Sequence, residues 1–371
     1  NTDTEKHEEV SSFRKDNSSL FPKKTDIIHI MRDSLKIAIA GATGYTGIEL
    51  IKILSYHPKV KINYLCAQKS VGKEINIFDK NIEKKNLPKI SKIEKINWNE
   101  IDVLFTALPN GEAQKIANTM PSKVILIDLS GDFRLNDSNL YKKWYGIEHK
   151  SKKLINKSIY ALTEFAKKKI KNYKIISCPG CYPTSVQIPL IPLLSKNLIN
   201  EKKIIIDSKS GYSGAGKSIK KKFNFKKLLT SVSAYGVGSH KHMAEIDQEL
   251  SKISKKDINV TFTPHLMPMF RGILSTIYIE TKKNYNGKNI YNELKKFHKK
   301  NYFVKFAKFN EPIGTGDVIN TNYCKVSVCQ DRTSNKIIII SAIDNLIKGA
   351  SGQAVQNMNI AFNFNESMGL K

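Results

Sequence analysis

The feature that most restricts the fold is a glycine-rich turn between a short apolar segment and an amphipathic one. Lys36-Ile-Ala-Ile-Ala40 has the composition of a buried strand, and residues 46–56 have that of a helix. Between them lies Gly41-Ala-Thr-Gly44-Tyr-Thr-Gly47, whose glycines permit a tight turn and let a pyrophosphate approach the helix N-terminus. The strand–turn–helix context favours a dinucleotide site. The alternative is an ordinary turn that binds nothing.

Apolar segments continue this alternation. Strands are expected over residues 60–67, 101–108, 124–129 and 173–177, with a helix near 113–117. The pattern predicts a parallel, doubly wound sheet, with a Lys- and Asn-rich surface excursion over 76–99. After residue 181 few helices separate the segments, which indicates a mixed or antiparallel sheet closed by a helix over 349–362. The strands expected there are 203–208, 259–266, 272–280, 322–329 and 336–343.

The end of the second strand bears on which dinucleotide binds. An NAD site usually presents Asp or Glu there, which contacts the ribose 2′-hydroxyl. This chain has Cys66-Ala-Gln-Lys69-Ser70 instead, and a cation with a hydroxyl suits a 2′-phosphate. NADP(H) is therefore the predicted cofactor; the alternative is that Lys69 is one more surface lysine. The predicted contacts in this part of the chain are Gly41, Thr43, Gly44, Tyr45, Thr46, Gly47, Lys69 and Ser70.

A second motif places a cysteine at a helix start. Cys178-Pro-Gly-Cys181 joins the strand over 173–177 to an apolar segment over 186–194 that is expected to be a buried helix. Unpaired N–H groups and the helix dipole favour a thiolate at such a position. We therefore expect Cys181 to be a nucleophile that holds an acyl group as a thioester. A redox pair is also compatible with the spacing, whereas Cys324 and Cys329 are poorly spaced to complete a zinc site, and no metal is predicted.

Thioester chemistry needs an acid/base, and Ser239-His240-Lys241-His242-Met-Ala-Glu245 offers candidates. The two histidines share a face if the segment is extended, and a helix is expected over 246–250. Glu245 is placed to orient an imidazole or to contact a substrate. Histidine pairs also bind metals, and surface histidines commonly do neither. His265 has no charged neighbour in sequence and is expected to be structural.

Composition narrows the class of protein. The 371 residues suffice for two domains, and no apolar run is long enough to predict a membrane span. The net charge of +28 permits nucleic-acid binding, but no basic-aromatic recognition motif accompanies it, so neither nucleic acid nor membrane is a predicted partner. Five cysteines without a secretory signal argue against a disulfide framework and make the cytoplasm the expected compartment. Residues 1–34 are expected to be a disordered extension.

Together the motifs resemble those of the N-acetyl-gamma-glutamyl-phosphate reductase family of arginine biosynthesis. The resemblance covers residues 35–371, and the number and order of its blocks make it specific. Cys178 departs from the pattern where the family usually has Asn, and Asn110 where it often has His. The matching blocks are Gly41–Leu50, Leu108–Gly111, Asp128–Leu135, Tyr160–Glu164, Pro179–Ser185, Ser210–Gly216, Gly238–His242 and Asp344–Val355.

The resemblance implies an α/β fold: a Rossmann-type doubly wound parallel sheet joined to an α+β catalytic domain like that of glyceraldehyde-3-phosphate dehydrogenase. The expected NADP-binding domain comprises residues 35–180 and 342–371, and the catalytic and oligomerisation domain comprises 181–341, in a homodimer or homotetramer. The implied reaction is the NADPH-dependent reduction of N-acetyl-γ-glutamyl phosphate through a thioester on Cys181. His240 or His242 would be the acid/base, with His242 slightly preferred.

The same resemblance implies that Arg134 binds substrate, and Glu245 and Ser185 are further predicted substrate contacts. For Arg134 the alternative is a structural ion pair with Asp132 or another acid. Two other classes stay open: a sister enzyme acting on aspartyl phosphate or on a carrier-bound amino-adipyl phosphate, and a nucleic-acid-binding protein that uses the charge of +28. Further cofactor contacts are implied at Pro109, Ser213, Gly214, Gly216, Asn345 and Gly349.

Overall fold

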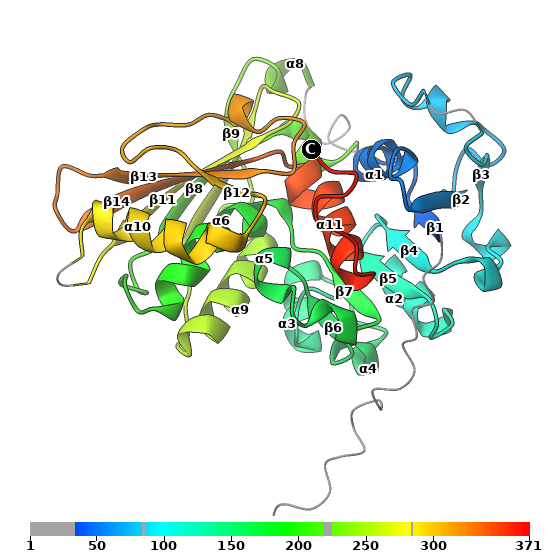
Figure 1. The fold of residues 1–371 in the computed structure, drawn as a ribbon, viewed down its shortest axis with the longest axis horizontal. Coiled ribbons are helices and arrows are strands. Elements are labelled where there is room, and N and C mark those ends of the chain that lie inside the picture. The colour runs from blue at the N-terminus through cyan, green and yellow to red at the C-terminus, as the bar shows by residue number, and fades with distance from the viewer. Residues whose placement is uncertain (1–33, 84–85, 218–224, 283–284) are drawn as a thin grey trace, which may run out of the picture. The chain divides into compact units, whose positions relative to one another are not determined.

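The structure is a computed structural model that describes residues 34–371 except 84–85, 218–224 and 283–284. The predicted extension over residues 1–34 therefore falls, but for its last residue, outside the described residues. The described chain contains two seven-stranded sheets (Figure 1). Within these described ranges, no helix combines the length and the apolar character needed to cross a membrane.

The first sheet has the strand order β3-β2-β1-β4-β5-β7-β6, and every pairing in it is parallel. The predicted parallel, doubly wound sheet is confirmed. The order reverses between β1 and β4, which is where such sheets bind ligands at their carboxyl ends. Its strands are β1 (Leu35–Ala40), β2 (Val60–Cys66), β3 (Ile90–Ser91), β4 (Val103–Thr106), β5 (Ile125–Asp128), β6 (Ser158–Tyr160) and β7 (Ile175–Ser177).

Helices connect these strands, as parallel pairing requires. The predicted helices after the glycine turn and near residue 113 are both present, whereas three others were not predicted. The two predicted helices are α1 (Tyr45–Ser55) and α2 (Glu112–Thr119), and the three others are α3 (Ser138–Tyr145), α4 (Lys152–Ile155) and α5 (Thr163–Ala166).

The second sheet has the order β12-β13-β14-β11-β8-β10-β9 and mixes parallel with antiparallel pairs, as predicted. Buried residues alternate with more exposed ones along its central strands, because helices cover one face. Its strands are β8 (Ile205–Gly211), β9 (Ser233–Ala234), β10 (Thr261–Met267), β11 (Ile273–Glu280), β12 (Val304–Phe306), β13 (Cys324–Gln330) and β14 (Lys336–Ile343). The helices are α6 (Cys181–Ser195), α8 (Phe225–Leu228), α9 (His242–Ser254) and α10 (Gly287–Phe297).

Helix α6 is buried on nearly every side, and two prolines, Pro189 and Pro192, lie beyond its first turn. Proline has no N–H, so Pro192 leaves the carbonyl of Ile188 without its helical donor. The ring Nε2 of His298 takes that place, 2.9 Å from the Ile188 oxygen. Helix α6, which begins with Cys181, is thus stabilised by a hydrogen bond with a residue outside the helix.

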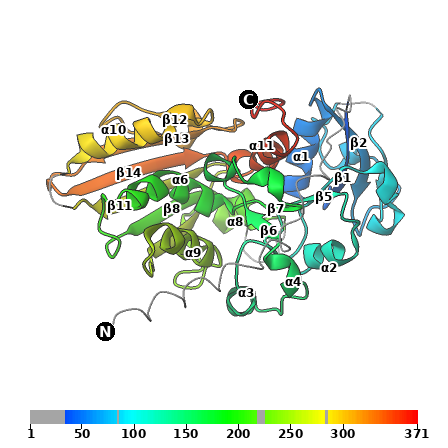
Figure 2. The same ribbon diagram turned by 60° about the horizontal axis from the view of Figure 1, so that its bottom comes forward.

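The chain returns to the first sheet at its C-terminal end. A π-helix, η8 (Ile347–Ser351), leads into α11 (Gly352–Ala361), which packs beside α1 (Figures 1 and 2). Arg271 links the same regions, since its guanidinium lies 2.6 Å from Glu49 on α1 and 3.2 Å from Asp344 before η8. Each sheet has its own apolar core, and the domain boundaries given above stay a prediction.

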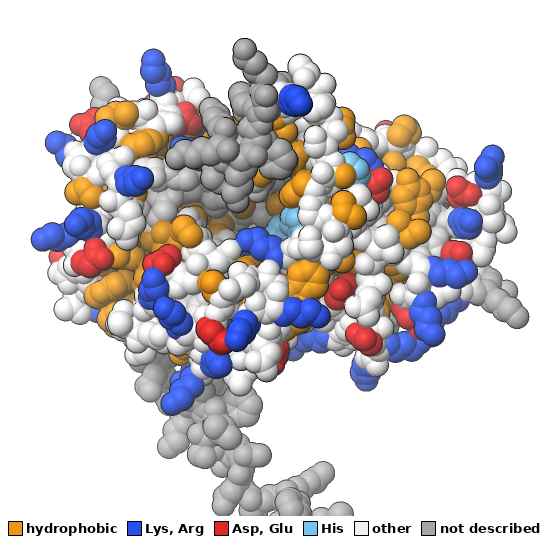
Figure 3. All heavy atoms as spheres, turned by 180° about the vertical axis from the view of Figure 1, so that it is seen from behind, with side chains coloured by type: hydrophobic (Ala, Val, Ile, Leu, Met, Phe, Trp, Pro, Cys, Tyr) orange, Lys and Arg blue, Asp and Glu red, His pale blue; other side chains and the backbone are white. Residues whose placement is uncertain are grey.

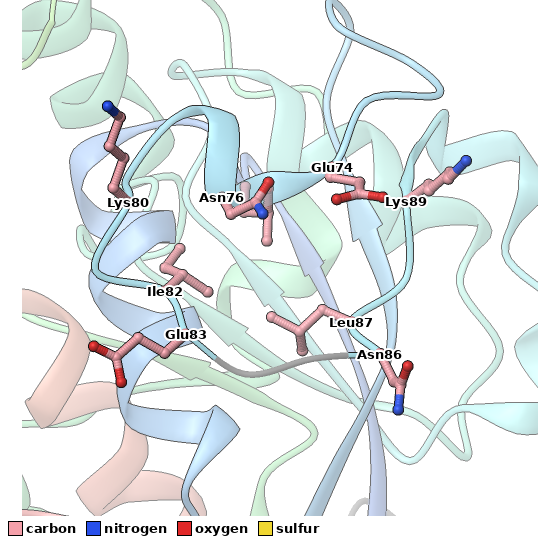
Figure 4. A pocket seen from close by; sticks show the side chains of 9 residues that line it. Glu74, Asn76, Lys80, Ile82, Glu83, Asn86, Leu87 and Lys89 are labelled. Carbon is pink, nitrogen blue, oxygen red and sulfur yellow. The ribbon is translucent and has the colours of Figure 1, made fainter.

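The predicted surface excursion after β2 is anchored by buried apolar side chains and by the short edge strand β3. Ile75 and Ile82 are among its buried residues. It carries an open pocket of about 810 Å³ lined by Glu74, Ile75, Asn76, Lys80, Ile82, Glu83, Asn86, Leu87 and Lys89 (Figure 4). None of the predicted site residues lines this pocket.

Candidate active site

Cys181 is the first residue of α6, as predicted, and Gly180 is its N-cap. Two other segments, which carry His242 and Gly349, approach the start of this helix closely. A Cβ at Gly180 would lie 2.7 Å from Cε1 of His242, and a Cβ at Gly349 would lie 2.7 Å from Cβ of Cys181. Only glycine fits at either position without displacing a neighbour. The thiol therefore lies where α6, the start of α9 and η8 meet.

Glu245, buried in the first turn of α9, organises this junction. Its Oε2 accepts hydrogen bonds from the backbone N–H of Gly180 at 2.9 Å and from the hydroxyl of Tyr160 at 3.2 Å. Its Oε1 lies 3.0 Å from the guanidinium of Arg134 and 3.8 Å from Nε2 of His242. One carboxylate thus connects the residue before the thiol to a histidine and an arginine.

The Arg134 side chain is buried with three partners inside the protein. Its Nε donates to the carbonyl of Cys178 at 2.8 Å, one terminal nitrogen pairs with Glu245, and the other donates to the carbonyl of Leu129 at 3.1 Å. The ion pair anticipated as the alternative for Arg134 is present, with Glu245 as the acid instead of Asp132. A substrate carboxylate would have to compete with these contacts.

The expectation that the helix start favours a thiolate is not met. Burial raises the pKa of the Cys181 thiol to about 11, although the charge of Arg134 and backbone N–H groups at the helix start act in the opposite direction. Burial prevails because removing a thiolate from water costs more than these few groups return. In this arrangement the thiol is protonated at neutral pH and needs a base.

The two histidines have different surroundings. Burial lowers the pKa of His242 well below its usual range, and the Nδ1 atom of His242 is buried without a hydrogen-bond partner in the described chain. His240 packs edge-on against the rings of Tyr182 and Tyr235, and its Nδ1 accepts a hydrogen bond from the backbone N–H of His242. Burial lowers the pKa of His240 to about 4. Both imidazoles are therefore neutral at pH 7, and the one against Gly180 belongs to His242.

Two other predicted residues have partners within the protein. The Ser185 hydroxyl is buried, donates to the carbonyl of Tyr182, and lies 2.7 Å from the hydroxyl of Ser275. Cys178 packs in the core of the first sheet, whereas Cys181 packs against that of the second. All five cysteines are free thiols, so the structure gives no support to a Cys178–Cys181 disulfide. Among the described residues no three His, Cys, Asp or Glu side chains converge as metal ligands.

The glycine turn lies at the reversal point of the first sheet. Gly41 has a φ of +91°, and a Cβ there would lie 2.8 Å from the carbonyl carbon of Ala107. A Cβ at Gly47 would lie 2.9 Å from the Cα of Ala42, so that glycine lets α1 pack on the turn. Gly44 caps α1 without any side-chain hydrogen bond, which leaves N–H groups of the first helical turn for another acceptor. The predicted contacts Thr43, Tyr45 and Thr46 belong to the same turn, and these features fit a dinucleotide pyrophosphate.

The remaining predicted cofactor residues divide into two groups. Lys69 and Ser70 follow the carboxyl end of β2, with Lys69 exposed and Ser70 at a φ of +73°, and Pro109 follows β4. In the second group, Asn345 accepts a hydrogen bond from the backbone N–H of Gly272 and donates one to the hydroxyl of Ser213. Gly214, Gly216 and Gly349 flank this second group in the chain. The first group thus lies at the carboxyl ends of β2 and β4, and of the second group Gly349 lies against Cys181.

Sequence reasoning missed several residues of the site. Tyr160 and Gln187 contact Glu245, and Asp132 accepts hydrogen bonds from Gly111 and Tyr141 in the loop that carries Arg134. Most of them lie inside the motif blocks quoted above, and that was the signal that could have found them. Asn110, a departure from the family pattern, accepts a hydrogen bond from Lys241 at 2.8 Å.

Comparisons with known proteins agree with this geometry. Residues 36–173 match the family described as semialdehyde dehydrogenase, NAD binding domain, and residues 181–345 match semialdehyde dehydrogenase, dimerisation domain. An aspartate semialdehyde dehydrogenase II from Vibrio cholerae has the same fold, with a TM-score of 0.68 at 18% identity over 90% of this chain and 99% of that one. The fold and site thus define a semialdehyde dehydrogenase-type oxidoreductase.

Curated relatives narrow the family. N-acetyl-gamma-glutamyl-phosphate reductase of Thermoanaerobacter is 46% identical over 91% of this chain and 98% of its own length. The probable chloroplastic reductase of Arabidopsis thaliana is 39% identical over 97% of this chain and 88% of its own length. The chain belongs to the N-acetyl-gamma-glutamyl-phosphate reductase family, and it is an oxidoreductase with an NAD-binding domain.

Proposed function

We propose that this chain reduces N-acetyl-γ-glutamyl phosphate to N-acetylglutamate 5-semialdehyde and phosphate, in arginine biosynthesis, through a thioester on Cys181. The observation that carries the proposal is the junction at the start of α6. There a cysteine, a neutral histidine with a largely covered side chain, and a buried carboxylate meet. Relatives of similar length carry the name of this reaction.

The first half of the reaction is acyl transfer. His242 accepts the proton of the Cys181 thiol, and the sulfur attacks the acyl carbon. The bond from that carbon to the phosphate oxygen then breaks, so phosphate leaves and a thioester remains. A neutral imidazole is required for this step, and the lowered pKa of His242 supplies it. Backbone N–H groups at the start of α6 would stabilise the oxyanion.

In the second half of the reaction, NADPH bound at the glycine turn would supply the hydride that reduces the thioester carbonyl. The protein's part is to release the aldehyde. His242, protonated in the first half, is placed to return its proton as the carbon–sulfur bond breaks and the Cys181 thiol forms again. Glu245 would orient the imidazole, because its Oε1 lies 3.8 Å from Nε2 while its Oε2 is fixed by Gly180 and Tyr160.

For substrate binding we propose that Arg134 acts chiefly through its charge and through Glu245. Its three hydrogen bonds within the protein support a fixed guanidinium beside the thiol. Arg134→Lys should raise KM for N-acetylglutamate semialdehyde far more than for NADP⁺, since lysine cannot reproduce the fork of donors. Unaltered kinetics in this variant would contradict a role for Arg134 in the site.

The deciding experiment is the reverse reaction. The purified chain is mixed with N-acetylglutamate semialdehyde, phosphate and NADP⁺, and NADPH is followed by absorbance. We expect phosphate-dependent reduction, and little with aspartate semialdehyde. Comparable turnover of the two semialdehydes would contradict the proposed substrate. Salt-dependent DNA binding without any reductase activity would favour the nucleic-acid alternative instead.

We also propose that the chain works as a homodimer paired through the uncovered face of the second sheet. Tyr278 on β11 is 42% exposed and lies between its register partners Ile338 on β14 and Ile205 on β8, the latter 49% exposed. Figure 3 shows hydrophobic side chains on the surface at this end of the molecule and also at the opposite end. An apolar row across three strands is expensive to leave in water, and a second copy would cover it.

For the compartment we propose the cytoplasm. A mechanism through a free thiol requires a reducing environment, and all five cysteines are unpaired. Two plant relatives are named chloroplastic, so the plastid is the alternative. A tagged full-length chain that concentrates in an organelle of its source cell would contradict the cytoplasmic assignment.

A further inference from the structure

The glycine turn is contacted by Lys217, a residue that follows strand β8 of the second sheet. Lys217 comes shortly after η5 (Tyr212–Ala215), the continuation of β8. Its ammonium group donates a hydrogen bond of 2.6 Å to the carbonyl oxygen of Thr43, inside the turn. The same group lies 5.3 Å from the centre of the Tyr45 ring and 5.8 Å from that of Phe78. Aromatic faces attract cations, so these rings hold the charge at the turn.

The backbone that leads to Lys217 is fixed by several contacts. The N–H of Gly216 donates to the carbonyl of Ser213 at 3.0 Å, and the N–H of Ser213 donates to the carbonyl of Phe270 at 3.0 Å. Arg271 follows Phe270 and pairs with Glu49 on α1, the helix that begins at the glycine turn. Lys217 is therefore presented to the turn by a segment tied to the same helix.

We propose that Lys217 binds the pyrophosphate of NADP(H) and completes the cofactor site from the side of the second sheet. The inference rests on the proposed cofactor site at the glycine turn. An ammonium group binds an ionised phosphate oxygen more strongly than a neutral carbonyl oxygen, so Lys217 exchanges or shares its bond to Thr43 when a dinucleotide is present. The N–H groups of α1 and the Lys217 cation then act on the same anion from two elements.

This assignment separates two lysines. Lys69 follows β2, where a Rossmann site meets the ribose, and its charge would distinguish NADPH from NADH. The pyrophosphate is common to both nucleotides, so Lys217 should act on both alike. Equilibrium binding can therefore assign each lysine to its phosphate.

The test measures the dissociation constants of NADPH and NADH by fluorescence titration of the full chain at low salt. Lys217→Gln should raise both dissociation constants by about tenfold, which is the lower end of the range of effects for losing a charge-assisted hydrogen bond. Lys217→Arg should stay close to the unmodified protein, and the loss should shrink as ionic strength rises. Lys69→Gln should weaken NADPH only. Lys336→Gln, an exposed lysine at the start of β14, is the control for net charge.

The two dissociation constants decide whether Lys217 binds the pyrophosphate. Equal losses for both nucleotides in Lys217→Gln, with Lys336→Gln unchanged, support the inference. An unchanged dissociation constant, or a loss for NADPH alone, overturns it. If the unmodified protein binds neither nucleotide, the cofactor site itself is wrong and the inference falls with it.

Discussion

Among single residues, Cys181 and Cys178 lie three positions apart in the chain, but we expect substitution to abolish turnover only at Cys181. Cys181→Ser should lower turnover by at least about 10³-fold, because a serine hydroxyl in the same place is a far weaker nucleophile. The dissociation constant of NADPH should be unchanged, since the glycine turn is untouched. The matched control is Cys178→Ser, which removes a thiol buried in the first sheet's core and should keep most activity. Normal steady-state rates in Cys181→Ser would contradict the thioester.

The pH dependence of the free thiol follows from its burial. With a pKa of about 11, the thiolate fraction of Cys181 grows about tenfold for each pH unit between 7 and 10. The rate of alkylation by iodoacetamide at Cys181, measured by peptide mass spectrometry, should rise in the same proportion. The Cys181→Ser protein corrects for the other thiols. A rate that is already constant above pH 7 would show that the helix start, not burial, dominates.

Cofactor choice is also set by single residues. Lys69→Glu should reduce the preference for NADPH by about 1–3 kcal/mol, the range for one hydrogen bond to a charged group. The exposed position of Lys69 after β2 places the effect at the lower end. The ratio of kcat/KM for the two cofactors measures it. Equal efficiencies with NADPH and NADH in the unmodified protein would refute the role of Lys69.

At the scale of elements, α6 tests how a proline-containing helix is supported. His298→Leu removes the group that faces the Ile188 carbonyl, while it keeps an apolar side chain of similar volume. A buried carbonyl without a partner should cost about 1–3 kcal/mol, and the urea midpoint followed by circular dichroism should fall. Lys299→Ala changes the exposed neighbour and should have little effect. An unchanged midpoint for His298→Leu would mean that another group satisfies the carbonyl.

The sequence was informative for most strands whose own residues form a clear apolar segment. The apolar segments of β1, β2, β10, β11 and β14 were predicted to within about two residues. Strands of two or three residues, such as β3 and β9, depend on a neighbour found only in the folded chain, so no local pattern marks them. Helix α10 was missed although its first residues form a capping box between Asn286 and Asn289, a signal that is local.

The site shows the same division. Motifs located Cys181, His242 and Glu245, because each belongs to a short block with a definite spacing. They could not show that burial would outweigh the helix start at the thiol, since desolvation depends on what the whole fold packs around it. They also could not choose between binding and structural roles for Arg134, whose partner Glu245 lies 111 residues away.

At the scale of the whole molecule, the uncovered sheet face predicts the assembly state. Tyr278→Glu places a charge in the middle of the apolar row formed with Ile338 and Ile205. In a symmetric dimer the change occurs twice in one interface, so the two new carboxylates would be forced together out of water. We expect sedimentation equilibrium to change from dimer to monomer at micromolar concentration.

The control for this change is Tyr56→Glu, which makes the same substitution at a tyrosine that is 66% exposed just after α1. It alters net charge equally, but the residue lies outside the second sheet and should leave the dimer intact. Circular dichroism separates loss of assembly from loss of folding. A Tyr278→Glu protein that stays folded and dimeric would place the interface elsewhere. If Tyr56→Glu dissociated the dimer instead, the pairing surface would lie near the C-terminal end of α1 and not on the apolar row of the second sheet.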